Sequence, residues 1–192
     1  PALTIGALFL LQSFAYYGLT TWFARFAGAY SGGQSFRPAP ALNLMLIAVA
    51  EVPGLFLTIS LIERLGRRPV LALNYAGAAC MIVLLGLVPP SQAAFTAITS
   101  LAYSFIVGVW TGLYVYGPEL FPTTVRSSAF AVCGSMGKLG GFLSPIVFGA
   151  LWDRPDGFTL TRWTVAGAFG MAALIAMLAI KETMGTRLSD SH

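Results

Sequence analysis

ERLGRRP, residues 63–69, is a short charged segment between two long apolar runs at 41–62 and 70–88. A helix that crosses a bilayer needs about 20 predominantly apolar residues. Both runs are close to that length and neither carries more than one charge. The segment therefore predicts a tight charged turn between two membrane helices.

Four further apolar runs flank this region, one before residue 41 and three after residue 88. A polar loop at 28–40 follows the first run, a Pro-Pro pair ends the third, and polar segments flank the fifth. The expected membrane helices cover residues 2–23, 41–62, 70–88, 93–116, 129–152 and 163–180. We expect an all-α membrane protein, a single bundle over 1–192 with no soluble domain.

The composition agrees with lipid as the solvent. The 192 residues are 57% hydrophobic and 9% charged, whereas soluble domains carry about 25% charged residues. The net charge of +4 comes from basic residues between apolar runs, which is typical of membrane topology signals. No basic cluster alternates with exposed aromatic residues, so we expect no nucleic-acid partner.

Catalytic and metal-binding chemistry is not expected. Cys80 and Cys133 both lie inside apolar runs, and their spacing fits neither a metal site nor a disulfide framework. The sole histidine is His192, and no nucleophile–base pair or phosphate loop is recognisable. We predict no enzyme activity, no metal and no cofactor. Because the chain starts at Pro1 rather than Met, we also expect a fragment of a longer protein.

Lysine and arginine residues in the short loops predict the orientation, since cytoplasmic loops carry the excess. The count is six against four in favour of the side that holds the turn at 63–69. We therefore expect this turn, the hinge at 118–126 and both termini in the cytoplasm of a plasma or bacterial inner membrane. One side carries Arg64, Arg67, Arg68, Arg126, Lys181 and Arg187, and the other carries Arg25, Arg37, Arg154 and Arg162.

Glu51 is an ionisable residue near the middle of the second expected helix, just before Pro53-Gly54. Charges within a span cost a few kcal/mol on insertion scales and usually have a function. An apolar environment favours the neutral carboxyl group, so Glu51 could exchange protons during transport. The alternative is a structural role, as partner to a cation or to a backbone donor near the Pro53 kink.

Lys138 lies in the fifth expected helix between Gly137 and Gly140-Gly141, whose small size permits close helix approach. Three roles are open for its ammonium group. It could attract an anionic substrate, pair with a carboxylate such as that of Glu51, or extend to the cytoplasmic surface.

Aromatic residues with polar tips lie deep in the first and fourth expected helices. Buried Tyr and Trp side chains need hydrogen-bond partners, which a substrate in a wet cavity can supply. The alternative for each of them is ordinary packing. The candidate substrate-binding residues are Tyr16, Tyr17, Tyr103 and Trp110, together with Lys138.

Three motifs resemble those of the major facilitator superfamily. The turn at 63–69 is similar to its D-R-x-G-R-R-P signature, with Glu63 in place of Asp. The stretch at 114–126, YVYGPELFPTTVR, is similar to the Y-x-P-E-x-F/Y-P-T-x-x-R segment after the tenth helix. The tail at 182–185, ETMG, is similar to the E-T-K-G after the twelfth helix, with Met in place of Lys.

Two more stretches resemble one branch of this superfamily. The residues at 51–54, EVPG, resemble the E-x-P-G of transporters related to synaptic vesicle protein 2. The stretch at 133–145, CGSMGKLGGFLSP, resembles a helix shared with organic ion transporters and aromatic-acid/proton symporters. Cation carriers of this group tend to have Asp where Lys138 stands, so the resemblance and the charge both favour an organic anion.

The resemblance implies that the chain is the C-terminal six-helix half, built from two inverted three-helix repeats, and that an N-terminal half is missing. The expected partners are a small-molecule substrate, the lipid bilayer, that second half and, in a symporter, protons. The alternatives are a sugar or polyol carrier and a non-transporting vesicle protein or receptor. Charges on the cytoplasmic face are expected to form a gating network of Glu63, Arg64, Arg67, Arg68, Glu119, Arg126 and Glu182. The alternative for the arginines of the turn is that they anchor the topology on a solvated face.

Overall fold

The structure is a computed structural model that describes residues 2–31 and 40–182. Arg37, Arg187, His192 and the tail residues at 183–185 lie outside the described residues, and so does the side chain of Pro40.

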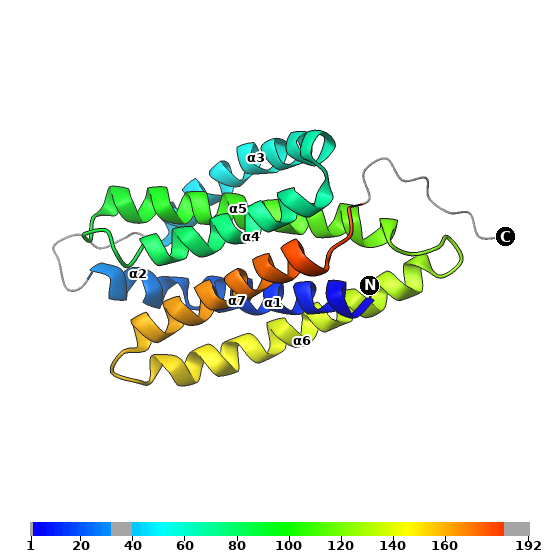
Figure 1. Cartoon of the computed structure of the whole chain (residues 1–192). Coiled ribbons are helices and arrows are strands. Elements are labelled where there is room, and N and C mark those ends of the chain that lie inside the picture. Colours follow the sequence, from blue (N-terminus) through cyan, green and yellow to red (C-terminus); the bar gives the residue numbers. More distant parts are fainter. Residues whose placement is uncertain (1, 32–39, 183–192) are drawn as a thin grey trace.

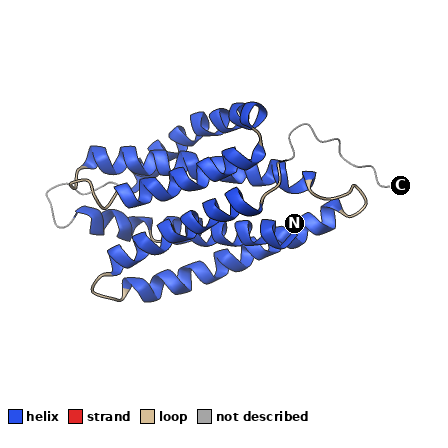
Figure 2. Ribbon diagram, viewed as in Figure 1, coloured by secondary structure: helices blue, strands red, loops and turns tan. Residues whose placement is uncertain are grey.

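The described residues form helices and connecting turns only, which confirms the all-α membrane fold (Figure 2). Five of the helices are long and apolar enough to cross a membrane, namely α1, α3, α5, α6 and α7. The sixth long helix, α4, begins with two arginines. The bounds are α1 Ala2–Thr21, α2 Phe23–Ser31, α3 Pro40–Leu65, α4 Arg67–Leu84, α5 Gln92–Glu119, α6 Arg126–Trp152 and α7 Gly157–Ala179.

Several helices extend beyond the apolar runs that predict them. The first run breaks at Trp22 and continues as α2 through part of the stretch expected to be a loop. Arg67, Glu119 and Arg126 lie inside helix ends rather than in turns. Hydropathy cannot place these ends, because a charged residue continues a helix when its side chain finds a partner at the surface.

The long helices form a bundle in which α1 packs along α6 and α7, α5 packs along α3 and α4, and α4 also packs along α7 (Figure 1). The α3–α4 turn, the α5–α6 turn and the end of α7 lie together at the right-hand end of the view. We call it the motif end, because the turn at 63–69, the stretch at 114–126 and Glu182 meet there.

The α1–α6 contact is close because small residues line it. A Cβ atom at Gly140 would collide with the carbonyl oxygen of Leu10. One turn along, Ser144 Oγ donates a hydrogen bond of 2.7 Å to the carbonyl oxygen of Phe14. Small residues and hydroxyl groups are the usual contacts of tightly packed membrane helices, and here they fix the two helices that carry most of the pocket described below.

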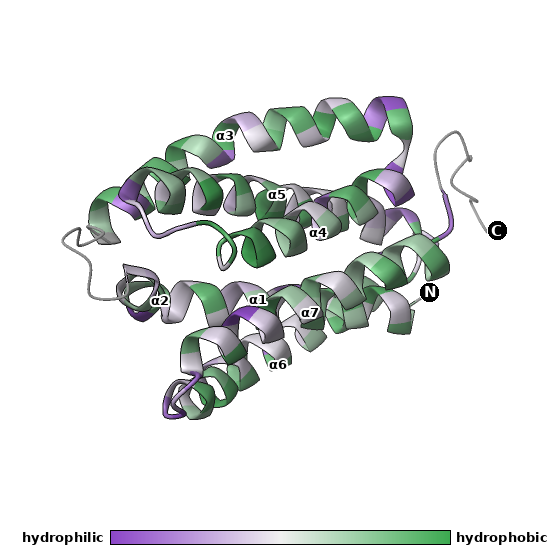
Figure 3. Cartoon of the chain, turned by 60° about the vertical axis from the view of Figure 1, so that its left-hand side comes forward, coloured by the Kyte–Doolittle hydropathy of each residue, from purple (hydrophilic) through white to green (hydrophobic). Residues whose placement is uncertain are grey.

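Large apolar side chains face outward on α3 and α6, and hydrophilic residues concentrate towards the helix ends (Figure 3). Phe56 on α3 is 65% exposed, and Phe142 on α6 is 69% exposed. Exposed apolar surface of this extent needs lipid or another membrane segment to cover it.

Candidate functional site

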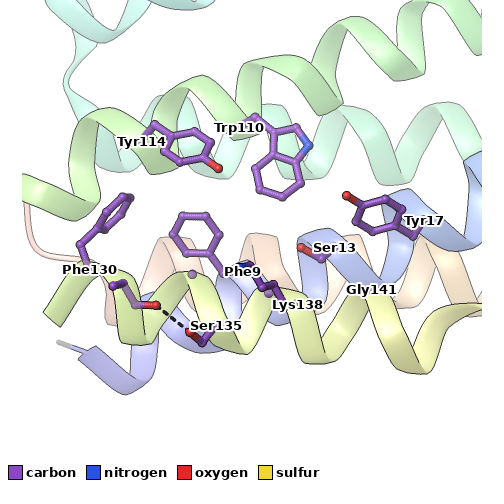
Figure 4. Close-up of a pocket in the computed structure, with 12 residues that line it drawn as sticks. Phe9, Ser13, Tyr17, Trp110, Tyr114, Phe130, Ser135, Lys138 and Gly141 are labelled. Carbon is purple, nitrogen blue, oxygen red and sulfur yellow. Dashed lines mark hydrogen bonds between the residues drawn. The ribbon is translucent and has the colours of Figure 1, made fainter. Parts of the chain in front are cut away.

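A pocket of about 590 Å³ opens between α1, α5 and α6. Its aromatic lining comes from two sides, with Trp110 and Tyr114 on α5 facing Phe9 on α1 and Phe130 on α6 (Figure 4). The Trp110 and Tyr114 rings are stacked, with centroids 6.0 Å apart and an interplanar angle of 24°. Phe9 meets Tyr114 edge-on at 5.8 Å, so the lining offers both flat and edge surfaces to an aromatic ring.

Lys138 brings a positive charge to this aromatic pocket. Its side chain is exposed, and it makes no ion pair or hydrogen bond with any residue that the structure describes. Of the roles left open by the sequence, pairing with Glu51 is not seen among these residues. An accessible ammonium group beside aromatic rings is suited to binding an organic anion.

The aromatic residues predicted from the sequence divide into two groups. Tyr17 and Trp110 line the pocket with Lys138, whereas Tyr16 and Tyr103 do not. Tyr103 is buried and its hydroxyl lies 3.1 Å from Thr20 Oγ1. The Tyr16 ring meets the Trp110 ring edge-on at 6.2 Å, so Tyr16 contacts the pocket wall from behind.

Glu51 lies on α3, outside the residues that line the pocket. It is half-buried and interacts electrostatically with Tyr16 and Tyr103. Tyr16 therefore interacts electrostatically with Glu51 and contacts Trp110 of the pocket wall.

A second group of predicted residues meets at the motif end. Arg67 Nη2 lies 2.8 Å from Glu119 Oε1, and Arg67 Nε donates to Glu119 Oε2 at 3.1 Å. This two-point ion pair joins the start of α4 to the end of α5. Its hydrogen bonds raise the pKa of Arg67 above the usual value for arginine, so the guanidinium group keeps its charge at physiological pH.

Glu182 binds the N-terminus of α4. Its carboxylate accepts hydrogen bonds of 3.0 Å from the backbone N–H groups of Arg67 and Arg68. A carboxylate at this position satisfies helix N–H groups and complements the helix dipole. Arg68 in turn donates to the carbonyl oxygen of Met177 near the end of α7. The start of α4 is therefore bound both to α7 and to Glu182 in the segment that follows it.

The remaining members of the predicted network lie at the same end but make fewer contacts. Glu63 interacts electrostatically with Arg67. Arg64 is exposed and makes no ion pair or hydrogen bond within the described part of the chain. Arg126 Nε donates to the carbonyl oxygen of Phe121 at 3.2 Å, which holds the α5–α6 turn.

Sequence reasoning missed several lining residues of the pocket. Once one lining residue of each helix is known, helical spacing indicates the others, because residues three or four apart share one helix face. Phe9, Ser13 and Tyr17 follow this spacing on α1, and Trp110 and Tyr114 follow it on α5. On α6 the lining residues are Phe130, Ala131, Gly134, Ser135, Gly137, Lys138 and Gly141.

No group of three metal-binding side chains gathers within the described residues. What the structure does present is a bundle of apolar helices with an accessible ammonium group in an aromatic pocket, an arrangement suited to a membrane transport protein. The chain matches the family model described as sugar (and other) transporter over residues 37–192. It therefore belongs to this family of the major facilitator superfamily, as the motifs predict.

The relatives support the branch that the sequence indicates. The chain is 30% identical to a niacin transporter of Acinetobacter baylyi over 92% of its length, and 31% identical to solute carrier family 22 member 15 of Xenopus tropicalis over 93%. It is 28% identical to the synaptic vesicle 2-related protein of Rattus norvegicus over 78%. These names confirm the expectation of a non-enzymatic membrane protein.

The chain spans much less than the whole of these relatives. It covers 39% of the niacin transporter, 33% of the solute carrier and 27% of the vesicle protein. The activity of the complete relatives therefore bears on this chain only as a proposal.

Proposed function

We propose that the chain forms one half of a secondary transporter for a small organic anion, an aromatic carboxylate. The observation that carries the proposal is the accessible ammonium group of Lys138 in a pocket with aromatic walls. A carboxylate would pair with Lys138 and its ring would lie against Trp110 and Tyr114. Niacin, which one relative is named for transporting, is a compound of this class.

The proposal includes a second six-helix half on the open side of the pocket. Tyr17 and Tyr114 line the pocket and are 46% and 58% exposed. Substrate sites of such transporters lie near the bilayer midplane, where two repeats or bundles meet. Rocking of the two halves would expose this site to each side in turn, with the motif end on the cytoplasmic side.

Glu51 is proposed to couple the substrate to protons. Glu51 is half-buried on α3 and interacts electrostatically with Tyr16, whose ring contacts Trp110. A proton taken up by Glu51 would change the local charge beside the pocket wall.

Uptake of a panel of solutes into proteoliposomes that contain the full-length protein tests the substrate class. We expect uptake of nicotinate or benzoate, and an increase when the outside is acidic. Lys138→Gln should reduce this uptake at least 10-fold, whereas Lys181→Gln, at the motif end, should leave it within 2-fold. Glu51→Gln should remove the stimulation by acid and keep substrate binding.

The panel also distinguishes the two alternatives. The family description includes sugars, so uptake of neutral sugars that is insensitive to Lys138→Gln would replace the anion proposal. A correctly inserted protein that binds ligands without any uptake would favour a non-transporting function, as one relative is named for synaptic vesicles.

A further inference from the structure

Ser13 differs from the hydroxyl residues of the bundle that bond their own helix. A serine or threonine inside a helix commonly bonds the carbonyl oxygen four residues before it. Ser13 on α1 makes no such bond and has no other hydrogen-bond partner within residues 2–31 and 40–182, although it is only 3% exposed. The residues that do bond their own helix in this way are Ser60, Ser104, Ser135, Thr99, Thr111 and Thr164.

The Ser13 side chain lines the pocket (Figure 4). Gly137 lies opposite on α6, and a Cβ atom there would be 3.0 Å from Ser13 Oγ. The absence of a side chain at Gly137 therefore leaves room at this hydroxyl group. Since Lys138 follows directly, the ammonium and hydroxyl groups reach the same pocket from facing helices.

The Ser13 hydroxyl group reaches the pocket without a partner in the described part of the chain, so it is available to a ligand. A ligand atom that accepts or donates a hydrogen bond would gain this contact, and an analogue without that atom would not. Ser13 is thus able to distinguish between ligands that Lys138 and the aromatic walls bind alike.

We infer that Ser13 is a specificity-determining residue that selects aromatic carboxylates with a second polar atom, a ring nitrogen or a ring hydroxyl. The inference rests on the proposed function, in which the carboxylate pairs with Lys138. The ring lies against Trp110 and Tyr114, and its polar atom hydrogen-bonds Ser13 Oγ.

Equilibrium binding of nicotinate and benzoate to the intact transporter tests the inference, because the two compounds differ by one ring nitrogen. Ser13→Ala should weaken nicotinate binding about 10-fold, which corresponds to ~1.4 kcal/mol, and should leave benzoate within 2-fold. Ser60→Ala is the matched control, since Ser60 on α3 lies outside the pocket lining and its hydroxyl bonds the Phe56 carbonyl oxygen at 3.0 Å. It should change neither affinity.

Retained benzoate binding shows that the Ser13 variant is folded. Equal loss of both ligands, or no loss of nicotinate, would overturn the inference. If Lys138→Gln weakens both carboxylates while Ser13→Ala changes neither, the proposed function stands and the inference alone fails. If neither carboxylate binds the unaltered protein, both fail.

Discussion

Gly66 has a backbone angle and a close neighbour that favour glycine over every other residue type. Its φ of +93° lies in the region that side chains disfavour, and a Cβ atom would lie 2.6 Å from Glu182 Oε2. The backbone at Gly66 thereby aims the first N–H groups of α4 at the Glu182 carboxylate. The contact between the tail and α4 depends on this one glycine.

We predict that Gly66→Ala lowers the free energy of unfolding by about 1–2 kcal/mol, because an L-residue is strained there and its methyl group displaces Glu182. Thermal unfolding in detergent, followed by circular dichroism, measures the change. Gly167→Ala is the control, since a Cβ atom at Gly167 on α7 meets nothing within 4 Å. Equal stability of the two variants would contradict the prediction.

The pocket shows how far residue-level prediction from sequence extends. The sequence predicts three of the lining residues, Lys138, Trp110 and Tyr17, because polar or charged groups inside an apolar run need a partner. The same argument also selected Tyr16 and Tyr103, which lie behind the wall. Which side of a helix faces a pocket depends on its rotation against its neighbours, and the weak amphipathicity of membrane helices does not encode that rotation.

Two arginines join α4 and α7 in a reciprocal manner. Arg68, at the start of α4, donates to the Met177 carbonyl near the end of α7. Arg162, near the start of α7, donates to the Val83 carbonyl near the end of α4 at 3.4 Å. Each positive charge complements the negative C-terminal end of the antiparallel neighbour, so the helix pair is fastened at both ends.

Gly86 makes the second of these contacts possible. A Cβ atom there would occupy the position of the Arg162 guanidinium group, which is buried. We predict that Gly86→Ala and Arg162→Gln each lower the free energy of unfolding by about 1–3 kcal/mol, since both remove a charged hydrogen bond. Thermal unfolding of the two variants and of their combination, in the form of a double-mutant cycle, measures the coupling.

The double variant should be no less stable than the less stable single variant, because Gly86→Ala acts by displacing Arg162. Losses that simply add would show that the two residues act separately.

The order of the long helices follows from the apolar runs, while the separate helix α2 and the helix ends do not. The prediction for α7 began at Trp163, yet the helix begins at Gly157 and includes Arg162. Hydropathy treats an arginine as the edge of a span. Here Arg162 lies within the helix because its guanidinium group binds the Val83 carbonyl oxygen at the end of α4, in space left by the missing side chain of Gly86. Both residues lie about 80 positions away in sequence.

At the scale of the whole molecule, contacts at the motif end join α4 to α5 and to the segment after α7. The Arg67–Glu119 pair joins α4 to α5, and Glu182 joins the segment after α7 to α4. Both contacts would have to adjust for this end of the bundle to open. The two-point pair is 21% and 24% exposed at its side chains, so it contributes about 1 kcal/mol rather than the larger value of a buried pair.

We predict that Arg67→Gln shifts the transporter towards the form that is open at the motif end. The expected shift is about 5-fold, the equivalent of ~1 kcal/mol. A cysteine introduced by Ser135→Cys in the pocket reports it, through its rate of labelling by a membrane-impermeant maleimide from the cytoplasmic side. Cys80 is exposed and is replaced by alanine in the background.

Arg64→Gln is the matched control, because this arginine belongs to the same turn and is exposed. It removes the same charge from the turn without removing the pair, so labelling should stay within 2-fold of the background. The combination of Arg67→Glu with Glu119→Arg should restore slow labelling, since it rebuilds the pair with its charges exchanged. If Arg64→Gln accelerates labelling as much as Arg67→Gln, the turn acts through its total charge, and the paired geometry of Arg67 is not what keeps this end closed.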